Sequence, residues 1–355
     1  MEMGENAVEV VIGIDAHKRT HTMVVCDAMG RQLAVKTVPA TGDGHLLALD
    51  WAARWPRRRW AVEDCRHLTR RLEADLLRAG ETLARVPIKL MAEMRRTGRE
   101  PGKSDPIDAL AVARAAWRVP SLPTARLDGP QRELRLLVDH RDDLVRERTR
   151  MQSRIRWHLH ELDPELIVRP RGLRSQRTVD RVLADLDGRD GLLVDLAREL
   201  LLRVRELNQR ALELERRITR IVYQLAPSLM EIPGCGPLSA AKIVGETAGA
   251  ARFRSRSAYA RWNGSAPQPV WTGNTTRFRL TRSGNRQVNA ALHRIAVTQA
   301  RTPGLGQDYL KRRMASGKTK TEALRLLRRR LSDVVFRTLL ADEAPTPNRR
   351  NPQST

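Results

Sequence analysis

The stretch VEVVIGID, residues 8–15, is a short apolar run rich in β-branched residues that ends in an aspartate. Such a run is typical of a buried β-strand. The segments THTMVVCDAMG (20–30) and RQLAVKTVPAT (31–41) predict two further strands, with a turn at Ala28-Met29-Gly30 between them. The N-terminal region therefore starts from a three-stranded meander whose first strand ends at Asp15.

Strands and helices alternate beyond this meander. The patterns predict helices at 45–55 and 67–80 and strands at 58–64 and 81–88. The strand RRWAVED, residues 58–64, again ends in acidic residues. This alternation indicates an α/β domain, which we place at residues 8–120.

Seven-residue repeats dominate the middle of the chain. Residues 131–163 predict one long helix with a heptad series and an adjacent arginine series: Leu137, Leu144 and Met151, beside Arg141 and Arg148. A second helix carries two parallel series: Leu193, Leu200, Leu207, Leu214 and Ile221, and Ala197, Val204, Ala211, Ile218 and Leu225. Such heptads predict a long helical coiled coil at 130–226, either as an intramolecular hairpin or as a pairing between chains.

The last third of the chain predicts a mainly α-helical C-terminal domain at 227–340. The stretch EIPGCGPLSAAKIVGETAG, residues 231–249, has the form of a helix-hairpin-helix, in which a glycine-containing turn opens a helix. Backbone N–H groups at such a turn can meet a phosphate, although a turn that only caps a core helix gives a similar pattern. The polar segment 341–355 predicts a disordered tail.

Charge points to the class of partner. Lys and Arg number 65 against 41 Asp and Glu, a net charge of +24 that is spread along the chain, so a polyanion is the expected partner. No apolar run approaches the roughly 20 residues that a membrane span needs, and the acidic N-terminus lacks the basic start of a signal peptide. The three scattered cysteines suggest neither a zinc site nor a disulfide framework. We therefore expect no membrane partner and a cytoplasmic, nucleoid-associated protein.

Four acids stand at positions suited to metal binding. Asp15 and Glu63 close two strands, and Asp105 and Asp108 open a helix in the segment KSDPIDA. Positions three apart share a helix face, and converging carboxylates need a counter-charge such as Mg²⁺ or Mn²⁺. The alternative for Asp105-Pro106-Ile107-Asp108 is a helix start, with Asp105 as N-cap and Asp108 at N3. Capping and ligation need not exclude each other.

These motifs together resemble a known family. GIDAHKRTHTMVVCD, AVED and KSDPIDA match, in order, the RuvC-like DEDD domain of the Piv-type invertases and the related IS110 transposases. IPGCGPLSAAKIVGE and RSRSAYARWNGSAPQPVWTGNTTRFRLTRSGNRQVNAALHRIA match the family's C-terminal domain, so the resemblance covers nearly the whole chain. It implies a RuvC-like (RNase H-like) N-terminal fold and an insertion-sequence transposase or site-specific recombinase that cleaves and exchanges DNA strands with metal assistance.

The resemblance also implies site residues. The metal-binding and catalytic tetrad would be Asp15, Glu63, Asp105 and Asp108, with Mg²⁺ or Mn²⁺ as the ion. Asp64 rivals Glu63 by one position, and we prefer Glu63 because AVE continues the alternation of the strand. His17 and Lys18 follow the first acid closely and either touch phosphate or lie in a solvated turn.

The C-terminal domain of the family carries a serine nucleophile in a Ser-Gly step shortly after a proline. This chain departs from that pattern, since Thr272 stands at this place before Gly273. Thr272 is the preferred nucleophile, followed by Ser283 and Ser265; the alternative is that Thr272 only shapes a turn. Four arginines surround this loop and are expected to contact nucleic acid: Arg277, Arg279, Arg282 and Arg286.

Partners follow from the family as well. Many members are guided by a structured noncoding (bridge) RNA, which implies such an RNA here besides donor and target DNA. Strand exchange joins two cut sites, which implies a homodimer that assembles into a tetramer. Two alternatives remain: a resolvase-type endonuclease that activates water and needs no C-terminal hydroxyl, and a non-catalytic nucleic-acid-binding protein.

Overall fold

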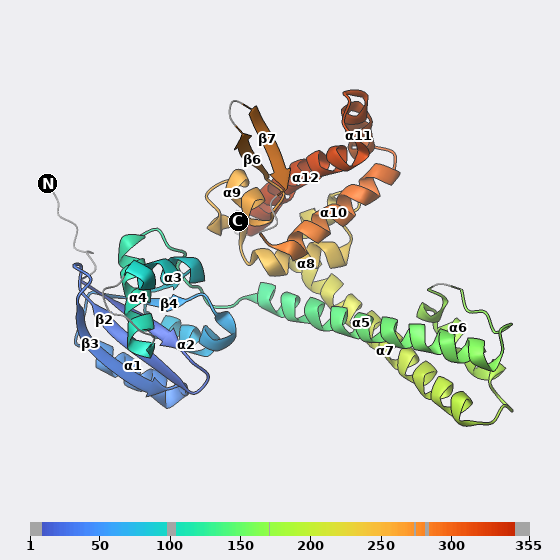
Figure 1. The fold of residues 1–355 in the computed structure, drawn as a ribbon, viewed down its shortest axis with the longest axis horizontal. Helices are drawn as coiled ribbons and strands as arrows, with labels where there is room; N and C mark the ends of the chain where they lie inside the picture. Colours follow the sequence, from blue (N-terminus) through green and yellow to red (C-terminus); the bar gives the residue numbers. More distant parts are fainter. Residues whose placement is uncertain (1–8, 98–103, 170, 273–274, 281–283, 345–355) are drawn as a thin grey trace, which may run out of the picture. The chain divides into compact units, whose positions relative to one another are not determined.

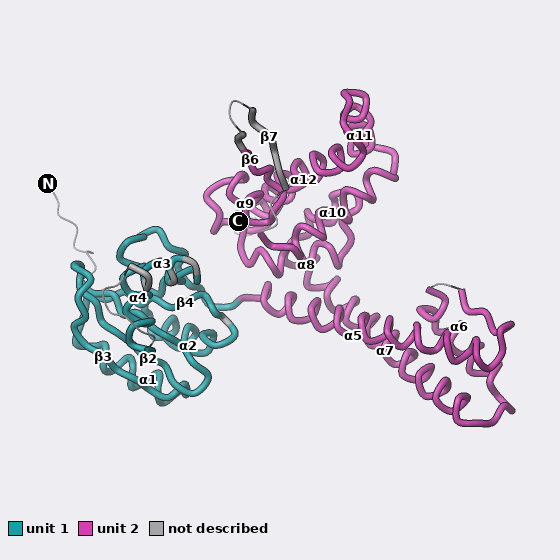
Figure 2. Tube along the Cα trace, in the orientation of Figure 1, with its two compact units in different colours: residues 1–128 teal, residues 129–355 magenta. Residues whose placement is uncertain are grey.

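The chain forms two compact units, residues 1–128 and residues 129–355 (Figure 2). The computed structural model describes residues 9–97, 104–169, 171–272, 275–280 and 284–344. The predicted boundary between a helical segment and a C-terminal domain, at 226/227, lies inside the second unit. Each unit has hydrophobic clusters of its own and is described by itself.

A five-stranded mixed sheet forms the centre of the first unit (Figure 1). Its order is β3-β2-β1-β4-β5, and the strands are β1 (Val10–Ala16), β2 (Thr20–Cys26), β3 (Gln32–Pro39), β4 (Arg58–Glu63) and β5 (Leu83–Val86). Strands β1, β2 and β3 form an antiparallel meander, whereas β4 and β5 run parallel to β1. This topology confirms the predicted RuvC-like (RNase H-like) α/β domain.

Helices cover both faces of this sheet. Helices α1 (Gly42–Ala52) and α2 (Arg66–Arg78) pack on the face that carries Ile12 and Ile14. Helices α3 (Ile88–Thr97) and α4 (Asp105–Arg118) pack on the face that carries Val11. Of these helices, α3 was not predicted.

Helix α4 lies directly on β1 because position 13 is glycine. A Cβ at Gly13 would come within 2.1 Å of the Ala109 carbonyl oxygen and 2.8 Å of the Ala113 Cβ. Only a residue without a side chain permits this approach. The contact fixes the start of α4 beside the end of β1.

The second unit begins with a long antiparallel helical hairpin (Figure 1). Its arms are α5 (Pro130–Leu162) and α7 (Leu192–Leu225), and the short helix α6 (Gln176–Asp185) packs at the far end. The intramolecular hairpin, one of the two predicted arrangements, is thus observed. Pairing between chains stays a prediction.

The buried seam of this hairpin differs from the predicted leucine series on α5. Its buried positions are Leu134, Val138, Arg148, Gln152, Ile155 and Leu159, whereas the series beginning at Leu137 is only half-buried. The predicted arginine series therefore lies nearer the centre of the contact. Arg148 Nη1 donates to Asn208 Oδ1 at 2.9 Å, and Arg141 Nη2 donates to Glu215 Oε2 at 2.7 Å. Polar partners across the seam allow arginine there.

The rest of the second unit is mainly helical, as predicted. It contains α8 (Pro237–Thr247), α9 (Arg256–Trp262), α10 (Arg286–Arg301), α11 (Leu305–Ala315) and α12 (Lys320–Glu343). A two-stranded hairpin of β6 (Pro267–Thr272) and β7 (Thr275–Leu280), which was not predicted, interrupts the helices. Helix α12 reaches Glu343, so the predicted tail boundary at 341 was wrong, because Ala341 and Asp342 continue the helix. Among the described helices, none is long and apolar enough to cross a membrane.

Candidate active site

Asp15 and Glu63 stand side by side at one edge of the sheet. Ile14 pairs with Val62 between the parallel strands β1 and β4, and the next residue of each strand is the acid. Strand residues alternate between faces. Because Trp60 and Val62 face α1 and α2, alternation places Glu63 on the face that α4 covers.

Glu63 and its rival Asp64 occupy different positions on this edge. Asp64 follows the last residue of β4, and its backbone N–H donates to the Val86 carbonyl oxygen at 2.9 Å. The strand alternation therefore assigns Asp64 to the face opposite Glu63. This placement agrees with our preference for Glu63, whose role stays a prediction.

The start of α4 brings in the second pair of acids, but not as predicted. Ser104 is the N-cap and Asp105 is the first helical residue, so Asp105 as N-cap was wrong. The Asp108 N–H donates to the Ser104 carbonyl oxygen at 3.0 Å, the first bond of the helix. The Asp105 carboxylate is directed toward β1 instead, where it meets His17.

His17 lies between two of the predicted acids. Its Nε2 is 3.1 Å from Asp15 Oδ2 and 3.4 Å from Asp105 Oδ1, and one ligand atom from each of the three residues lies within 4.8 Å of the others. A tight turn holds the histidine there, since its backbone N–H donates to the Thr20 carbonyl oxygen at 2.9 Å. The sequence shows His17 close to the first acid and leaves open whether it contacts phosphate or lies in a solvated turn. The tight turn into β2 places its side chain in the cluster.

The charges of two other acids of the predicted set reach Asp15. Burial raises the pKa of Asp15, His17 lowers it in part, and the charges of Asp108 and Asp105 raise it again. Burial also raises the pKa of the Cys65 thiol to about 11, helped by the charges of Glu63, Asp15 and Asp64. The three acids Asp15, Asp105 and Asp108 thus interact electrostatically, and Asp108 is only 8% exposed.

This donor set fits a hard divalent cation. Carboxylate oxygens are the ligands that Mg²⁺ and Mn²⁺ prefer, and imidazole nitrogen is tolerated better by Mn²⁺. A cation would also reverse the repulsion that raises the pKa of Asp15. Among the described residues, Asp15, Asp105 and His17 offer converging ligand atoms, with Asp108 and Glu63 nearby.

The predicted nucleophile stands at the tip of the β6–β7 hairpin. Thr272 pairs with Thr275, Val270 with Arg277 and Gln268 with Arg279. In this register the positions of Thr272, Arg277 and Arg279 belong to one face of the ribbon. The side chains of residues 271–280, and residues Arg282 and Ser283 altogether, lie outside the described part of the chain.

Two further predicted residues of this region are described. Arg286 is exposed at the start of α10. Ser265 is only 9% exposed, its hydroxyl donates to the Ala260 carbonyl oxygen at 3.4 Å, and its backbone N–H donates to Asn263 Oδ1 at 3.0 Å. This buried position makes Ser265 the least suitable of the three hydroxyl candidates.

The base of the hairpin is clamped from both sides. A Cβ at Gly284, which has a φ of +100°, would lie 2.8 Å from the Trp262 carbonyl oxygen. The Asn285 N–H donates to the same oxygen at 2.7 Å, and its side-chain oxygen accepts from the Val288 N–H at 2.9 Å, capping α10. The segment after β7 is thereby tied to the segment before β6.

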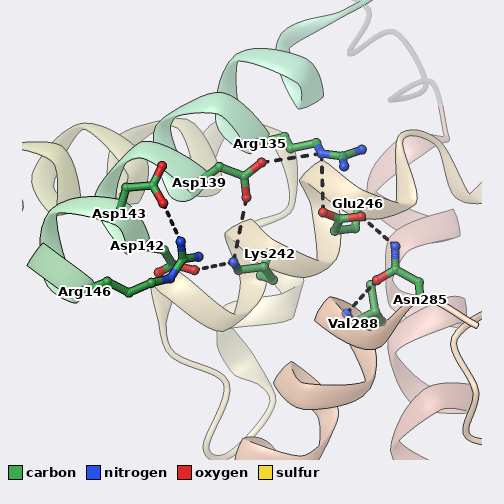
Figure 3. A network of polar contacts seen from close by, with 9 residues as sticks. All are labelled: Arg135, Asp139, Asp142, Asp143, Arg146, Lys242, Glu246, Asn285 and Val288. Atoms are coloured by element: carbon green, nitrogen blue, oxygen red, sulfur yellow. Dashed lines mark hydrogen bonds and ion pairs between the residues drawn. The ribbon is translucent and has the colours of Figure 1, made fainter. Parts of the chain in front are cut away.

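Ion pairs in which one partner is buried connect this clamp to the helical hairpin (Figure 3). Asn285 Nδ2 donates to Glu246 Oε2 at 2.6 Å, and Glu246 Oε1 lies 3.4 Å from Arg135 Nε. One turn earlier on α8, the buried Lys242 Nζ lies 2.5 Å from Asp142 Oδ2. Helix α8 is thus fixed to α5 on one side and to the start of α10 on the other.

Comparisons with known proteins agree across both units. Residues 12–164 match the DEDD transposase family of the IS110 type, and residues 226–311 match the transposase family IS116/IS110/IS902. A 44.8 kDa protein of insertion element IS116 from Streptomyces clavuligerus is 27% identical, with 95% of this chain and 96% of that protein covered. A 42 kDa protein of IS900 from Mycobacterium paratuberculosis is 26% identical, with 95% of this chain and 97% of that protein covered.

A solved structure was also found. T. thermophilus RuvC in complex with a Holliday junction substrate is 18% identical, and the match covers 33% of this chain and 99% of that chain with a TM-score of 0.27.

Proposed function

Because this chain belongs to the IS110 family of insertion-element transposases, we propose that it cleaves and exchanges DNA strands by metal-assisted phosphoryl transfer. The observation that carries the proposal is the acidic cluster at the end of β1. Asp15 and Asp105 converge through His17, and the charge of Asp108 reaches Asp15. Carboxylates gathered beside one another raise the energy of the metal-free site, which favours a functional over a structural role.

The residues that would hold the ion are Asp15, Asp105, Asp108 and Glu63. A bound Mg²⁺ or Mn²⁺ would stabilise negative charge on the attacking and leaving oxygens of phosphoryl transfer. His17, half exposed beside the two nearest acids, either joins the ligands or yields its place to the ion. The other residues keep the carboxylates in position: Gly13 lets α4 approach, and Ser104 leaves Asp105 available.

In the proposed transfer step, the hydroxyl of Thr272 is the nucleophile. Its hydroxyl oxygen would form a bond to a DNA phosphorus while the bond from phosphorus to the departing sugar oxygen breaks. The hydroxyl proton passes to solvent, and the departing oxygen takes up a proton, so the DNA strand becomes linked to the protein without loss of a phosphodiester. Attack by another strand's sugar hydroxyl then reverses the step and completes exchange.

A suicide DNA substrate tests this assignment. The DNA carries a nick close to the cleavage position, so the short departing strand diffuses away and the protein stays linked to the remainder. Mass spectrometry of the digested adduct should place the link on Thr272, and Thr272→Ser should keep it while Thr272→Ala loses it. A link on Ser283 would overturn the assignment, and Ser265→Ala serves as the control that leaves adduct yield unchanged.

An endonuclease that activates water is the second candidate function. It is favoured by one observation: the whole acidic cluster comes from residues 15–108, inside one compact unit. This mechanism predicts that Thr272→Ala still cuts DNA in a metal-dependent way and releases free ends. The proposed recombinase predicts that the same variant gives neither adduct nor exchanged product.

The arginines around the hairpin are proposed to hold phosphates. The net charge of +24 and the shared ribbon face of Thr272, Arg277 and Arg279 support this role. Replacing the exposed Arg286 by Ala should weaken DNA binding about equally for all sequences and reduce the slope of log K against log salt by about 1. An unchanged slope would remove Arg286 from the interface.

Guidance and assembly remain proposals from the family. The bridge RNA would supply sequence choice by base pairing, while the protein contacts shape and backbone. Sequencing the RNA that co-purifies with the protein should return one discrete noncoding RNA from the flanks of the element. Solution mass measured with and without nucleic acid should show a dimer that becomes a tetramer.

A further inference from the structure

A cavity of about 690 Å³ lies in the second unit. The residues that line it belong neither to the β6–β7 hairpin nor to the clamp at its base. It opens between the start of α11, the helix α12 and the segment that follows α7. Apolar side chains form most of its walls, among them Ile232, Leu327, Leu331 and Val334. The size is within the range of about 300–1,000 Å³ that is usual for small-ligand sites.

Two hydrogen bonds hold the walls in place. Ser228 Oγ donates to Asp342 Oδ1 at 2.6 Å, which ties the segment after α7 to the end of α12. Gln299 Nε2 donates to the Pro233 carbonyl oxygen at 2.7 Å, which ties the end of α10 to the same segment. Both bonds join segments that line the cavity.

An aromatic ring and arginines line the cavity. The Tyr309 ring has the guanidinium carbons of Arg330 and Arg313 at 4.9 Å and 5.2 Å from its centre. Arg312 and Arg330 also line the cavity, where Glu231 is the acid among the described lining residues. Burial raises the pKa of Tyr309, yet hydrogen bonds and charges from the two stacked arginines lower it overall, so the potential at the ring is positive.

We propose that this cavity binds one unpaired nucleotide of a nucleic acid, with the base in the apolar space beside Tyr309 and its phosphate on Arg312 and Arg330. Planar aromatic and guanidinium groups are the surfaces on which unstacked bases lie, and arginine is a preferred phosphate partner. The arginines favour an anionic ligand over a neutral apolar one, and a nucleotide joins a flat base that suits the apolar space to a phosphate that suits the adjoining cations. The shared chemistry fits DNA and RNA alike.

The inference rests on the proposal that the chain binds nucleic acid, and it does not involve the acidic cluster. Binding can therefore be measured in EDTA, where no metal-dependent cleavage occurs. The probes are a DNA and an RNA oligonucleotide of about 10 nucleotides with a central 2-aminopurine, whose fluorescence changes when the base leaves its neighbours. Blunt duplexes of the same sequence serve as reference ligands.

The variants are Arg330→Ala, Tyr309→Ala and the control Arg325→Ala, which removes one exposed arginine of α12 outside the cavity lining. We expect Arg330→Ala and Tyr309→Ala to weaken single-strand binding about 10-fold and to abolish the 2-aminopurine change, since one stacked base is worth about 5- to 150-fold. The control should weaken binding no more than about 2-fold. A change in 2-aminopurine fluorescence with the DNA probe, the RNA probe or both supports the site. It also identifies which nucleic acid supplies the nucleotide.

Photo-cross-linking of the wild-type protein makes the test independent of whether Tyr309→Ala folds. A thio-substituted base in either probe should cross-link within the segments that line the cavity, residues 228–233, 299–312 or 327–341. Cross-links elsewhere, or equal affinities for Arg330→Ala and Arg325→Ala, would overturn the site while leaving nucleic-acid binding intact. A change of solution mass in Arg330→Ala without any change in oligonucleotide binding would instead assign the cavity to a second copy of the chain. Failure of the wild-type protein to bind any oligonucleotide would overturn both this site and the proposed function.

Discussion

The end of β1 in the first unit and the contact between α5 and α8 in the second unit treat buried charge in opposite ways. Asp15, 13% exposed, is surrounded by the charges of Asp108 and Asp105 and contacts the half-exposed His17. Glu246, 7% exposed, lies against Arg135, and Lys242, 5% exposed, lies against Asp142. Like charges gather in one place, and opposite charges pair in the other.

This difference separates two reasons for burying a charge. An ion pair compensates the charge of its buried member and holds helices together, although it adds little net stability over apolar packing. Clustered acids raise the free energy of the folded protein until a cation binds. The second arrangement persists only where a ligand offsets the repulsion, which is why it marks a site.

The largest expected effect concerns DNA cleavage and tests the acidic cluster at the end of β1. Asp15→Asn should lower metal-dependent DNA cleavage by about 10²–10³-fold, because the ion contributes several kcal/mol to the transition state. Cleavage is measured on labelled DNA over a range of Mg²⁺ concentrations. The control is Asp50→Asn, an exposed acid of α1, and equal activity of the two variants would contradict the assignment of the acidic cluster.

A buried titratable group that stays neutral extends the comparison. His21 is 2% exposed and stacks on His45 with 5.4 Å between ring centres, and burial followed by the charges of His45 and His17 lowers its pKa to about 4. The folded state therefore resists protonation between about pH 6.5 and pH 4, and stability falls as pH falls through this window. We expect a loss of about 2–3 kcal/mol between about pH 7 and pH 4.5.

Urea unfolding at the two pH values measures this effect. His21→Leu should remove most of the pH dependence, whereas His67→Leu, which replaces an exposed histidine of α2, should keep it. An equally steep pH dependence in His21→Leu would show that other groups carry it.

Removing an ion pair of the second unit should have a smaller effect, on the free energy of unfolding. Lys242→Met should lower the free energy of unfolding by about 2 kcal/mol, because the half-buried Asp142 loses its partner while the apolar stem is kept. Lys311→Met on the exposed side of α11 is the matched control. A change within about 0.5 kcal/mol in both variants would mean that the α5–α8 contact does not depend on the pair.

The smallest expected effect is a stabilisation of the metal-free protein. Asp108→Asn in metal-free protein should raise the melting temperature by about 1–3 °C, because it removes a charge that opposes Asp15. Mg²⁺ should raise the melting temperature of the wild type and much less that of the variant. A destabilised metal-free variant would mean that Asp108 is structural rather than one of the repelling acids.

Much of the first unit follows from local sequence. Local sequence patterns predict the five strands, whereas the glycine at position 13 in β1 has a reason that is not local: it makes room for the Ala109 backbone of α4. The sequence also identifies both strand-end acids and the pair on α4. The prediction of the N-cap fails, since Ser104 and Asp105 are both residue types that favour this position, and the folded chain has Ser104 there.

The heptads show the same limit in the second unit. Two seven-residue series on neighbouring positions of α5 are equally regular, and hydrophobicity favours the leucines. The observed seam nevertheless includes Arg148, because Asn208 on α7 accepts its hydrogen bond. A partner on another helix is not readable from the helix that carries the arginine.

The sequence by itself determined the periodicities, the order of the strands in the first unit, the basic charge and the acids at strand ends, because each depends on neighbours along the chain. The tertiary structure alone decided that His17 joins the acidic cluster, that Glu63 takes the face of α4, and that Tyr309 meets two arginines beside a cavity. These features depend on side chains that are distant in sequence or on which way an element turns. Burial and electrostatic coupling act through space, so only the folded chain brings those groups together.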